Sequence, residues 1–420
     1  MQILHAADLH VGARPYQLEG LQRIFLEAFD EIVALAVRER VSALLIAGDL
    51  FDRPRPGNDI VRRVARGLRR LSDKGIPVVA AHGEHDTPGR RESTVLQLLS
   101  DLIDGFHAPR PSKPGPEGVA ETILEVGGLT VAVYPLVKAD PRTRKQVARR
   151  LLPLYSKLLE SRPGRRVFLA HVGLAEVVGC PAPDPEDCPF DLGVADLPPV
   201  DYAALGHIHK RWVGGGGRVP RAAYPGSVFP KDIVEARDRF PRGPLLVDLS
   251  GDEPTVQEAP LDIADYTALA VDVPGPRAVA RVIGEALEEA ARRLAGARHR
   301  VVFLEAYAPP EVPVARLEKE AARRGGELGL TVALRTVRVA GVPGEGRAKT
   351  ASLAESLGVV DPAALISASY GVSKRTAQLI LELKEALLES PHSPRVLEIL
   401  DALYEQPDYQ ALIAKMLRGR

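Results

Sequence analysis

Short apolar runs alternate with longer amphipathic segments along the first half of the chain. Five of the runs lie at 2–7, 41–48, 76–83, 165–172 and 200–207. The segments 21–40 and 59–75 instead place apolar side chains at helical spacing, so that Ile24, Ala28 and Ile32 share one face of the first. Strands that alternate with amphipathic helices indicate an α/β layered fold in which helices pack on a sheet.

The pattern changes twice beyond residue 210. Residues 210–255 form hairpin-like pieces, and residues 256–340 alternate three strands with two helices, which favours a small two-layer α/β domain. A linker at 340–350 leads into a helical tail. The apolar stripe of this tail consists of Leu379, Ile380, Leu383 and Leu387. We therefore expect three regions, at 1–255, 256–340 and 341–420.

Composition and charge limit the classes of protein without choosing one. Apolar residues make up 45% of the chain and charged residues 26%, as in ordinary soluble proteins. No run of about 18 apolar residues could span a membrane, and the N-terminus reads as a strand rather than a secretion signal, so we expect a cytoplasmic protein. The formal net charge is zero, which weakens a DNA-binding interpretation without removing it.

Two cysteines, Cys180 and Cys188, lie in a proline-rich segment, and two interpretations of them stay open. No further Cys or His stands nearby at ligand spacing, so we do not expect a zinc site. They are either free thiols or a disulfide, which intracellular proteins of hyperthermophiles do carry. One asparagine, two methionines and 36 prolines are typical of a thermophilic source.

Polar side chains gather where each of the five apolar runs ends. The residues in these positions are Asp8, His10, Asp49, Glu84, His85, His171, His207 and His209. Ligands of α/β sheets bind beyond the carboxyl ends of the strands, and adjacent strands lie about 5 Å apart, so these side chains can converge. Each short motif alone occurs by chance, but the ordered set predicts a metal site.

The residue types in this set indicate which metals and which chemistry. Carboxylate and imidazole groups without thiolate suit divalent ions such as Mn, Fe, Co or Zn. The set holds more ligands than one ion needs. Asp49, on a central strand, could bridge two ions roughly 3.5–4 Å apart, an arrangement that hydrolyses phosphate esters.

The order of these motifs resembles the calcineurin-like metallophosphoesterases. More specifically, four segments are similar to the nuclease subunit of the double-strand-break repair complex, the SbcD and meiotic-recombination-eleven family. These segments are HAADLHVG (5–12), IAGDLFDRPRP (46–56), ALGHIHKR (204–211) and YPGSVF (224–229). The resemblance implies a metallophosphoesterase β-sandwich flanked by helices in 1–255. By layout alone it also implies a small α/β capping domain that contacts DNA and a helical C-terminal tail.

The resemblance also implies a role for each site residue. The first metal would be held by Asp8, His10, Asp49 and His209, and the second by Asp49 as a bridge, Glu84, His171 and His207. His85 would not be a ligand; it would face the scissile phosphate and stabilise the transition state or protonate the leaving oxygen. The cofactors would be two Mn²⁺ ions, with Mg²⁺ or another divalent ion as the alternative. Residues 224–227 either shape the site wall or form a plain turn.

One position departs from the family. The family has G-N-H-D where this chain has GEHD, so Glu84 replaces a neutral asparagine ligand. An extra charge about 4 Å from an incoming phosphate is worth roughly 4 kcal/mol at an effective dielectric of about 20. If uncompensated, it would slow cleavage about a thousandfold. Either Glu84 binds metal and activity is only lowered, or the second site is weak and the chain acts as a scaffold for DNA ends.

The implied activity is that of a Mn-dependent 3′–5′ DNA exonuclease and single-strand endonuclease in double-strand-break repair and homologous recombination. Its partners would be DNA ends, a coiled-coil SMC-like ATPase bound at the tail, and a second copy of the chain contacted near 91–103, all at the nucleoid. Arg53, Arg55, Arg90 and Arg91, in loops beside the site, are either phosphate contacts or solvated residues. The alternatives are a DNA-end-binding subunit without catalysis and a phosphoesterase of small substrates.

Overall fold

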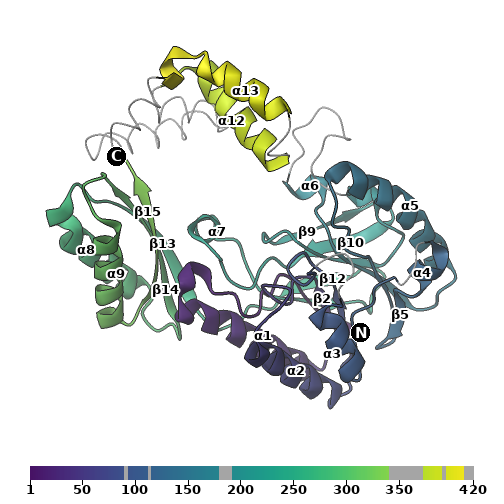
Figure 1. Ribbon diagram of the computed structural model, residues 1–420. Coiled ribbons are helices and arrows are strands. Elements are labelled where there is room, and N and C mark those ends of the chain that lie inside the picture. Colours follow the sequence, from purple (N-terminus) through teal and green to yellow (C-terminus); the bar gives the residue numbers. More distant parts are fainter. Residues whose placement is uncertain (89–92, 112–114, 179–191, 340–371, 390–393, 411–420) are drawn as a thin grey trace. The chain divides into compact units, whose positions relative to one another are not determined.

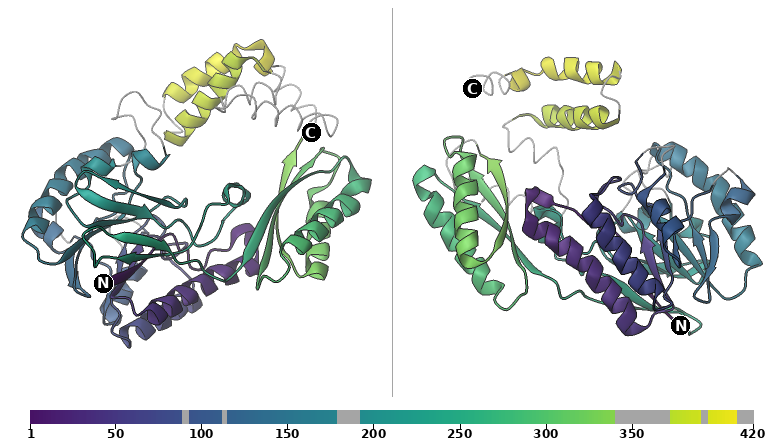
Figure 2. Two further views of the ribbon diagram at one scale, coloured as in Figure 1. Left: turned by 180° about the vertical axis from the view of Figure 1, so that it is seen from behind. Right: turned by 60° about the horizontal axis from the view of Figure 1, so that its bottom comes forward.

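The computed structural model describes residues 1–88, 93–111, 115–178, 192–339, 372–389 and 394–410. These residues form three sheets with helices between their strands (Figures 1 and 2). The chain divides into two compact units. The first comprises Met1–Leu269, Glu285–Glu305 and Ala321–Arg335, and the second comprises Ala270–Gly284, Ala306–Glu320 and Thr336–Arg420.

The first six-stranded sheet has the order β12-β11-β1-β2-β3-β4. Its strands are β1 (Gln2–Ala6), β2 (Ala43–Ala47), β3 (Val78–Ala81), β4 (Phe106–His107), β11 (Leu245–Asp248) and β12 (Thr255–Glu258). Strands β1 to β4 pair in parallel, whereas β11 joins β1 and β12 joins β11 in antiparallel register. The carboxyl ends of three of the predicted strands therefore lie at one edge.

The second six-stranded sheet has the order β5-β6-β7-β8-β10-β9. Its strands are β5 (Ile123–Val126), β6 (Leu129–Val133), β7 (Arg165–His171), β8 (Tyr202–Gly206), β9 (Trp212–Gly216) and β10 (Val219–Tyr224). Strands β6, β7, β8 and β10 pair in parallel. The two remaining predicted strands, β7 and β8, are neighbours in this sheet.

The two sheets pack face to face, because their strands are apolar on both sides. Leu45 of β2 and Leu169 of β7 belong to one buried cluster that draws on both sheets, so these side chains fill the space between them. The neighbouring residue Leu44 faces the other way and joins a cluster with the helices. This alternation makes a four-layer core of helix, sheet, sheet and helix.

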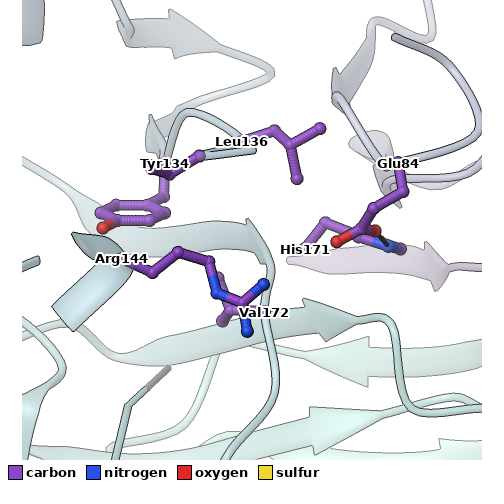
Figure 3. A pocket seen from close by; sticks show the side chains of 7 residues that line it. Glu84, Tyr134, Leu136, Arg144, His171 and Val172 are labelled. Carbon is purple, nitrogen blue, oxygen red and sulfur yellow. Dashed lines mark ion pairs between the residues drawn. The ribbon is translucent and has the colours of Figure 1, made fainter. Parts of the chain in front are cut away.

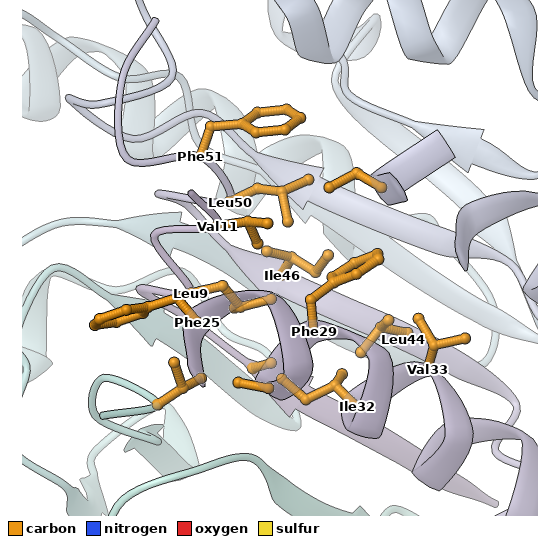
Figure 4. Close-up of a cluster of buried hydrophobic side chains, with 14 of the residues drawn as sticks. Leu9, Val11, Phe25, Phe29, Ile32, Val33, Leu44, Ile46, Leu50 and Phe51 are labelled. Atoms are coloured by element: carbon orange, nitrogen blue, oxygen red, sulfur yellow. The ribbon is translucent and has the colours of Figure 1, made fainter. Parts of the chain in front are cut away.

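Helices α1 (Glu19–Glu39) and α2 (Asn58–Ser72) cover the first sheet and lie side by side (Figures 1 and 2). Phe25, Phe29 and Ile32 of α1 are fully buried against Ile46 and its neighbours (Figure 4). Removing a phenylalanine from such a core costs about 3–5 kcal/mol, so this face fixes the helix on the sheet. The predicted helical face of α1 is therefore the packed face.

The other helices of this region are α3 (Val95–Leu102), α4 (Pro116–Ala120), α5 (Pro141–Glu160), α6 (Ala175–Val178) and α7 (Ile233–Asp238). On α5, Leu152, Tyr155 and Leu159 pack against the outward face of the second sheet, as the cluster with Phe168 and Tyr224 shows. The predicted β-sandwich core flanked by helices is thereby confirmed.

The third sheet has three strands in the order β13-β14-β15. These strands are β13 (Asp265–Asp272), β14 (Arg300–Ala308) and β15 (Thr331–Arg338), and helices α8 (Val279–Arg293) and α9 (Val314–Leu328) connect them. Buried residues of α8 recur at helical spacing, with Ile283, Leu287 and Ala290 almost inaccessible. The region has the small α/β form that its sequence pattern predicts.

The tail contains two described helices, α12 (Lys374–Glu389) and α13 (Pro394–Tyr404), which lie side by side (Figure 2). Leu379, Ile380 and Leu383 pack against a buried cluster on α13 formed around Ile399 and Leu403. The apolar stripe on α12 is therefore a core of the tail itself. The side chain of the fourth stripe residue, 387, lies outside the described residues.

Among the described residues, no helix is long and apolar enough to cross a bilayer. The cysteines at 180 and 188 both fall in a range that the structure leaves undescribed.

A buried histidine of β1 predicts a pH-dependent stability. His5 of β1 is fully buried, contacts the Tyr202 hydroxyl through Nδ1 at 2.8 Å, and has its pKa lowered by burial to about 3. Its unfolded pKa is about 6.5, so the stability contributed by neutral His5 is complete above that pH and falls as pH drops toward 3. Relative to pH 7, the loss at pH 4 reaches about 3 kcal/mol as an upper bound.

We expect His5→Gln to flatten this dependence. Thermal unfolding in EDTA, followed from pH 7 to pH 4, should show a smaller loss of stability in the variant than in the wild type. Because the other buried histidines are present in both proteins, the difference reports His5. Parallel profiles for the two proteins would contradict this assignment.

Candidate metal centre

The predicted site residues come together beyond the carboxyl ends of five strands from two sheets. Asp8 and His10 follow β1, Asp49 follows β2, and Glu84 and His85 follow β3. His171 ends β7, and His207 and His209 follow β8. Because the two sheets are packed face to face, loops from residues about two hundred positions apart meet at one rim.

The first ligand cluster consists of Asp8, His10 and His209, whose ligand atoms all lie within 4.8 Å of one another. The Nε2 atoms of His10 and His209 are 3.2 Å apart, and His209 Nε2 is 3.8 Å from Asp8 Oδ1. Asp8 and His10 are fully buried. Two imidazole nitrogens and a carboxylate oxygen thus converge in an interior position.

The second ligand cluster consists of Glu84, His171 and His207, again within 4.8 Å. Glu84 Oε2 lies 2.7 Å from His171 Nε2 and 3.5 Å from His207 Nδ1. His171 is buried, whereas the side chains of Glu84 and His207 are 41% and 43% exposed. This cluster is therefore the one open to solvent and to an incoming substrate.

Asp49 lies between the two clusters. Its Oδ2 is 3.9 Å from His10 Nε2 in the first cluster and 3.6 Å from His171 Nε2 in the second. It also forms a group within 4.8 Å with Asp8 and His171. Oδ1 accepts a hydrogen bond from the His85 backbone N–H at 2.9 Å, which turns Oδ2 toward the histidines. One carboxylate is thus in reach of both clusters.

Two histidines have tautomers that suit metal binding. His171 Nδ1 lies 2.8 Å from the Ala47 carbonyl, and His209 Nδ1 lies 2.7 Å from Glu235 Oε1. Because these oxygens only accept, Nδ1 carries the proton and Nε2 can hold a lone pair. His171 Nε2 is buried and faces Glu84 Oε2 at 2.7 Å, an acceptor to which it cannot donate unless it takes up a second proton. A cation would satisfy it, so these residues fit a divalent metal.

The charges at the centre also favour a bound cation. Burial raises the pKa of Asp8, against the opposing effect of His171 and His209. Burial alone would lower the pKa of His171, but Glu84, Asp49 and Asp8 raise it to about 10. Burial would raise the pKa of Glu84, but His171 and His207 hold it below its usual range. In the absence of metal, the carboxylates therefore draw a proton to His171 at a position that a cation would occupy.

The backbone at four residues of the ligand set adopts positive φ angles, which are rare for residues other than glycine. Asp8, His10 and Asp49 have φ of 52°, 44° and 50°, and His207 has φ of 98°. Such conformations cost of order 1–3 kcal/mol each and cluster at functional sites. Backbone hydrogen bonds from Asp8 N to the carbonyl of residue 48 and from His10 N to the Asp49 carbonyl, at 3.1 and 3.0 Å, hold these turns.

Comparison with known proteins agrees with this geometry. Residues 1–211 match the family model described as calcineurin-like phosphoesterase. The chain is 32% identical over 411 residues to the DNA double-strand break repair protein Mre11 of Aeropyrum pernix, and the match covers 96% of each chain.

The chain belongs to the Mre11 family.

Two further Mre11 proteins match a shorter part of the chain. The Sulfurisphaera tokodaii protein is 31% identical over 265 residues, which are 62% of this chain and 63% of its own length. The Saccharolobus solfataricus protein is 29% identical over 259 residues, 60% of this chain and 62% of its own length. The resemblance drawn from the strand-end motifs is thus confirmed at the level of the Mre11 family.

Glu84 is the residue at which this chain departs from the motif that the family resemblance implies. Its carboxylate belongs to the second ligand cluster and lines a small pocket with Tyr134, Arg144 and His171 (Figure 3). Lys138 donates to the Glu84 carbonyl at 2.9 Å and to the Thr87 carbonyl, which fixes the loop. Glu84 therefore lies in the second ligand cluster, in a loop that Lys138 holds and in a pocket that Arg144 also lines.

His85 is a member of neither ligand cluster, but it forms a group with His10 and Asp52 within 4.8 Å, and its ring lies edge-on to the His10 ring with centroids 4.7 Å apart. Its Nδ1–H donates to the Asp52 carbonyl at 2.7 Å, and its Nε2 is 4.0 Å from Asp49 Oδ2. The side chain is 42% exposed. The Nδ1–H hydrogen bond therefore fixes the ring orientation of a side chain that is partly exposed.

Two of the four candidate DNA contacts lie among the described residues. Arg53 is 64% exposed and lies 4.0 Å from Asp52, and Arg55 is also exposed. The two remaining arginines, at 90 and 91, lie outside the described residues.

The segment at 224–227 lies against the first ligand cluster, because Ser227 N donates to the His209 carbonyl at 3.1 Å.

Three residues of this centre were missed by sequence reasoning. Asp86 is 2% exposed and accepts from the backbone of Phe51 at 2.9 Å, which ties the loops after β2 and β3 together. Asp52 lies 3.8 Å from His10 Nδ1, and Glu235 binds His209. Asp86 and Asp52 each follow a predicted ligand in the same motif, so the motifs themselves could have indicated them. Nothing in the sequence around Glu235 does so.

Proposed function

We propose that this chain is a two-metal nuclease that processes DNA double-strand-break ends. The observation that carries the proposal is Asp49, whose carboxylate lies within 4 Å of a histidine from each ligand cluster. Membership of the Mre11 family supports DNA as the substrate. The finer activities that we propose are a 3′–5′ exonuclease and a single-strand endonuclease, both dependent on Mn²⁺.

The residues would divide the metals as the family resemblance implies. One ion would be held by Asp8, His10, Asp49 and His209, and the other by Asp49, Glu84, His171 and His207. Carboxylate and imidazole ligands suit Mn²⁺ and leave Mg²⁺ or another divalent ion as an alternative. When bound, such ions lower the pKa of water and neutralise charge that develops on a phosphate.

The protein's own groups would orient the phosphodiester. His85, with Nδ1–H fixed by the Asp52 carbonyl, would present Nε2 to the scissile phosphate or the leaving oxygen. Arg53 and Arg55 would contact neighbouring phosphates, because they are exposed in the loop that follows Asp49. We propose the same role for Arg90 and Arg91, and a further DNA contact for residues 256–340.

The experiment that tests this function is cleavage of a 3′-labelled DNA duplex in Mn²⁺, in Mg²⁺ and in EDTA, with metal content measured on the same protein. Metal-dependent shortening is the expected result. Binding of DNA ends without cleavage would favour the scaffold alternative. Hydrolysis of p-nitrophenyl phosphate esters without DNA cleavage would favour a phosphoesterase of small substrates.

Glu84→Asn is expected to raise the rate of DNA cleavage while two ions remain bound. The substitution removes a charge about 4 Å from the phosphate position, worth up to about a thousandfold in rate. Arg144 lines the same pocket, and any compensation from it would make the gain smaller. Single-turnover rates and elemental analysis of both proteins measure the effect.

Glu84→Gln is the matched control, since it removes the charge and keeps the length of the side chain. A similar increase in rate in both variants would assign the effect to the charge of Glu84. An increase in Glu84→Asn alone would assign it to the length of the side chain. An unchanged rate with two ions bound in every variant would show that the charge of Glu84 does not slow the enzyme.

We also propose that the chain forms a homodimer through α3. Leu98 and Leu102 are 50% and 63% exposed and lie four residues apart, on one face of that helix. A pair of large apolar side chains on a surface helix is typical of a contact between subunits.

The tail is the proposed binding site for a coiled-coil SMC-like ATPase. The α12 stripe is occupied by α13, but Leu397 and Tyr404 of α13 are 65% and 66% exposed and seven residues apart. A face of this kind suits a helix-in-groove contact. Deletion of residues 345–420 should abolish co-purification with the ATPase and leave metal binding intact.

A point variant makes the test of the tail sharper. Leu397→Ser combined with Tyr404→Ser should also release the ATPase, whereas Val213→Ser, at a 43% exposed valine of β9, should not. Retention of the partner by the double variant would contradict the proposed docking face.

A further inference from the structure

His209 of the first ligand cluster is held by a carboxylate from another element. Its Nδ1–H donates to Glu235 Oε1 at 2.7 Å, and the Glu235 side chain is 21% exposed. Because a carboxylate oxygen only accepts, the proton lies on Nδ1, and Nε2 faces Asp8 and His10 with its lone pair. The contact therefore selects the tautomer of His209 that can bind a cation.

Glu235 is itself fixed by several donors. Arg242 Nη1 lies 3.3 Å from Glu235 Oε2, and Arg242 Nη2 donates to the Glu235 carbonyl at 2.9 Å. The backbone N–H of Lys231 donates to Oε2 at 3.2 Å. Arg242 is 8% exposed and also donates to the Ser227 hydroxyl, beside His209. The carboxylate cannot turn away from His209 without breaking these bonds.

The helix that carries Glu235 is anchored on both sides. Helix α7 has only six residues, too few to be stable alone. Asp232 accepts from the backbone N–H groups of Val234 and Glu235 at 2.8 and 2.9 Å. Arg237 pairs with Glu305 of β14, whose side chain is 3% exposed. These contacts fix the position of the Glu235 side chain relative to His209.

We propose that Glu235 is a positioning residue for the metal ligand His209, which it keeps in the Nδ1-protonated tautomer. This proposal rests on the proposed two-metal function. It adds that the ion at the first ligand cluster is the one that depends on the Glu235 carboxylate. His171 of the second ligand cluster has its own acceptor, the Ala47 carbonyl. Loss of Glu235 therefore weakens the first ion and leaves the second in place.

Calorimetric titration of the metal-free full-length chain with MnCl₂ tests this. Glu235→Ala should weaken one of the two ions about 10–100-fold and leave the other unchanged. Glu235→Gln should lose less, because its amide oxygen can still accept from Nδ1–H. In ¹⁵N spectra of the metal-free protein, recorded at a pH where the imidazole is neutral, His209 should be the Nδ1–H tautomer in the wild type and in Glu235→Gln, and a mixture in Glu235→Ala.

Asp201→Ala is the matched control, because Asp201 is 18% exposed, pairs with Arg165 at 2.8 Å and precedes β8 at the end away from the site. It should bind both ions as the wild type does. Unchanged affinities or an unchanged His209 tautomer in Glu235→Ala would overturn the proposal, as would an equal loss of both ions with a lowered melting temperature in EDTA. A wild type that fails to bind two ions would instead refute the proposed function.

Discussion

Asp49→Ala is expected to abolish DNA cleavage and to lower the bound divalent metal from two ions to at most one per chain. Its Oδ2 lies 3.9 Å from His10 Nε2 and 3.6 Å from His171 Nε2, so one substitution removes a ligand from both clusters. Loss of paired metal ions removes the activation of water and the charge neutralisation together, which we expect to lower the rate by at least about 10⁴. Elemental analysis and a nuclease assay on the same preparation measure both effects.

Asp49→Asn keeps the volume and the acceptor for the His85 N–H, and so separates charge from shape. We expect the same loss of activity with an intact fold, checked by circular dichroism and by the melting temperature in EDTA. Wild-type cleavage by either variant, with two ions still bound, would contradict the bridging role.

His85→Ala is expected to abolish cleavage while both ions stay bound. The His85 backbone N–H holds Asp49, whereas its side chain donates to the Asp52 carbonyl and lies edge-on to the His10 ring, so loss of the side chain removes no atom from either ligand cluster. Removal of a general acid or a transition-state donor lowers a rate by about 10²–10⁴. The rate of degradation of a labelled duplex, beside metal content, measures this separation.

The control for this variant is Asp201→Ala, because Asp201 pairs with Arg165 at 2.8 Å and precedes β8 at the end away from the ligand clusters. It should cleave DNA as the wild type does. Loss of an ion in His85→Ala would make this residue a ligand, in the group that it forms with His10 and Asp52.

The ligand clusters could be predicted because their residues obey a rule of position. Each follows a strand whose apolar run is plain in the sequence, and parallel strands bring their carboxyl ends to one edge. His171 ends a strand of one sheet and His10 follows a strand of the other, yet the order of the motifs was enough to place both. The layered core was also predictable, because strands that are buried on both faces have unbroken apolar runs in the sequence.

The residues and backbone conformations that position the ligand side chains could not be predicted in the same way. Glu235 lies on a six-residue helix, which is too short to show periodicity, and reaches His209 across 26 positions of the sequence. The left-handed backbone of His10 and His207 has no sequence signal either, because histidine gives no turn preference as glycine does. Both features depend on tertiary contacts that overrule local propensity.

The tail shows a limit of a different kind. An apolar stripe such as Leu379, Ile380 and Leu383 is equally suited to a neighbouring helix of the same chain and to a partner protein. In the structure this stripe packs against α13 of the same chain. The exposed residues Leu397 and Tyr404 then become the candidates for a partner, and only the packing of the stripe reveals this.

The most direct test of the whole account is anomalous diffraction at the manganese edge from a crystal of the wild-type chain soaked in MnCl₂. The account predicts two peaks roughly 3.5–4 Å apart, one on each side of the Asp49 carboxylate. A single peak that does not touch Asp49, or no peak among these side chains, would contradict it.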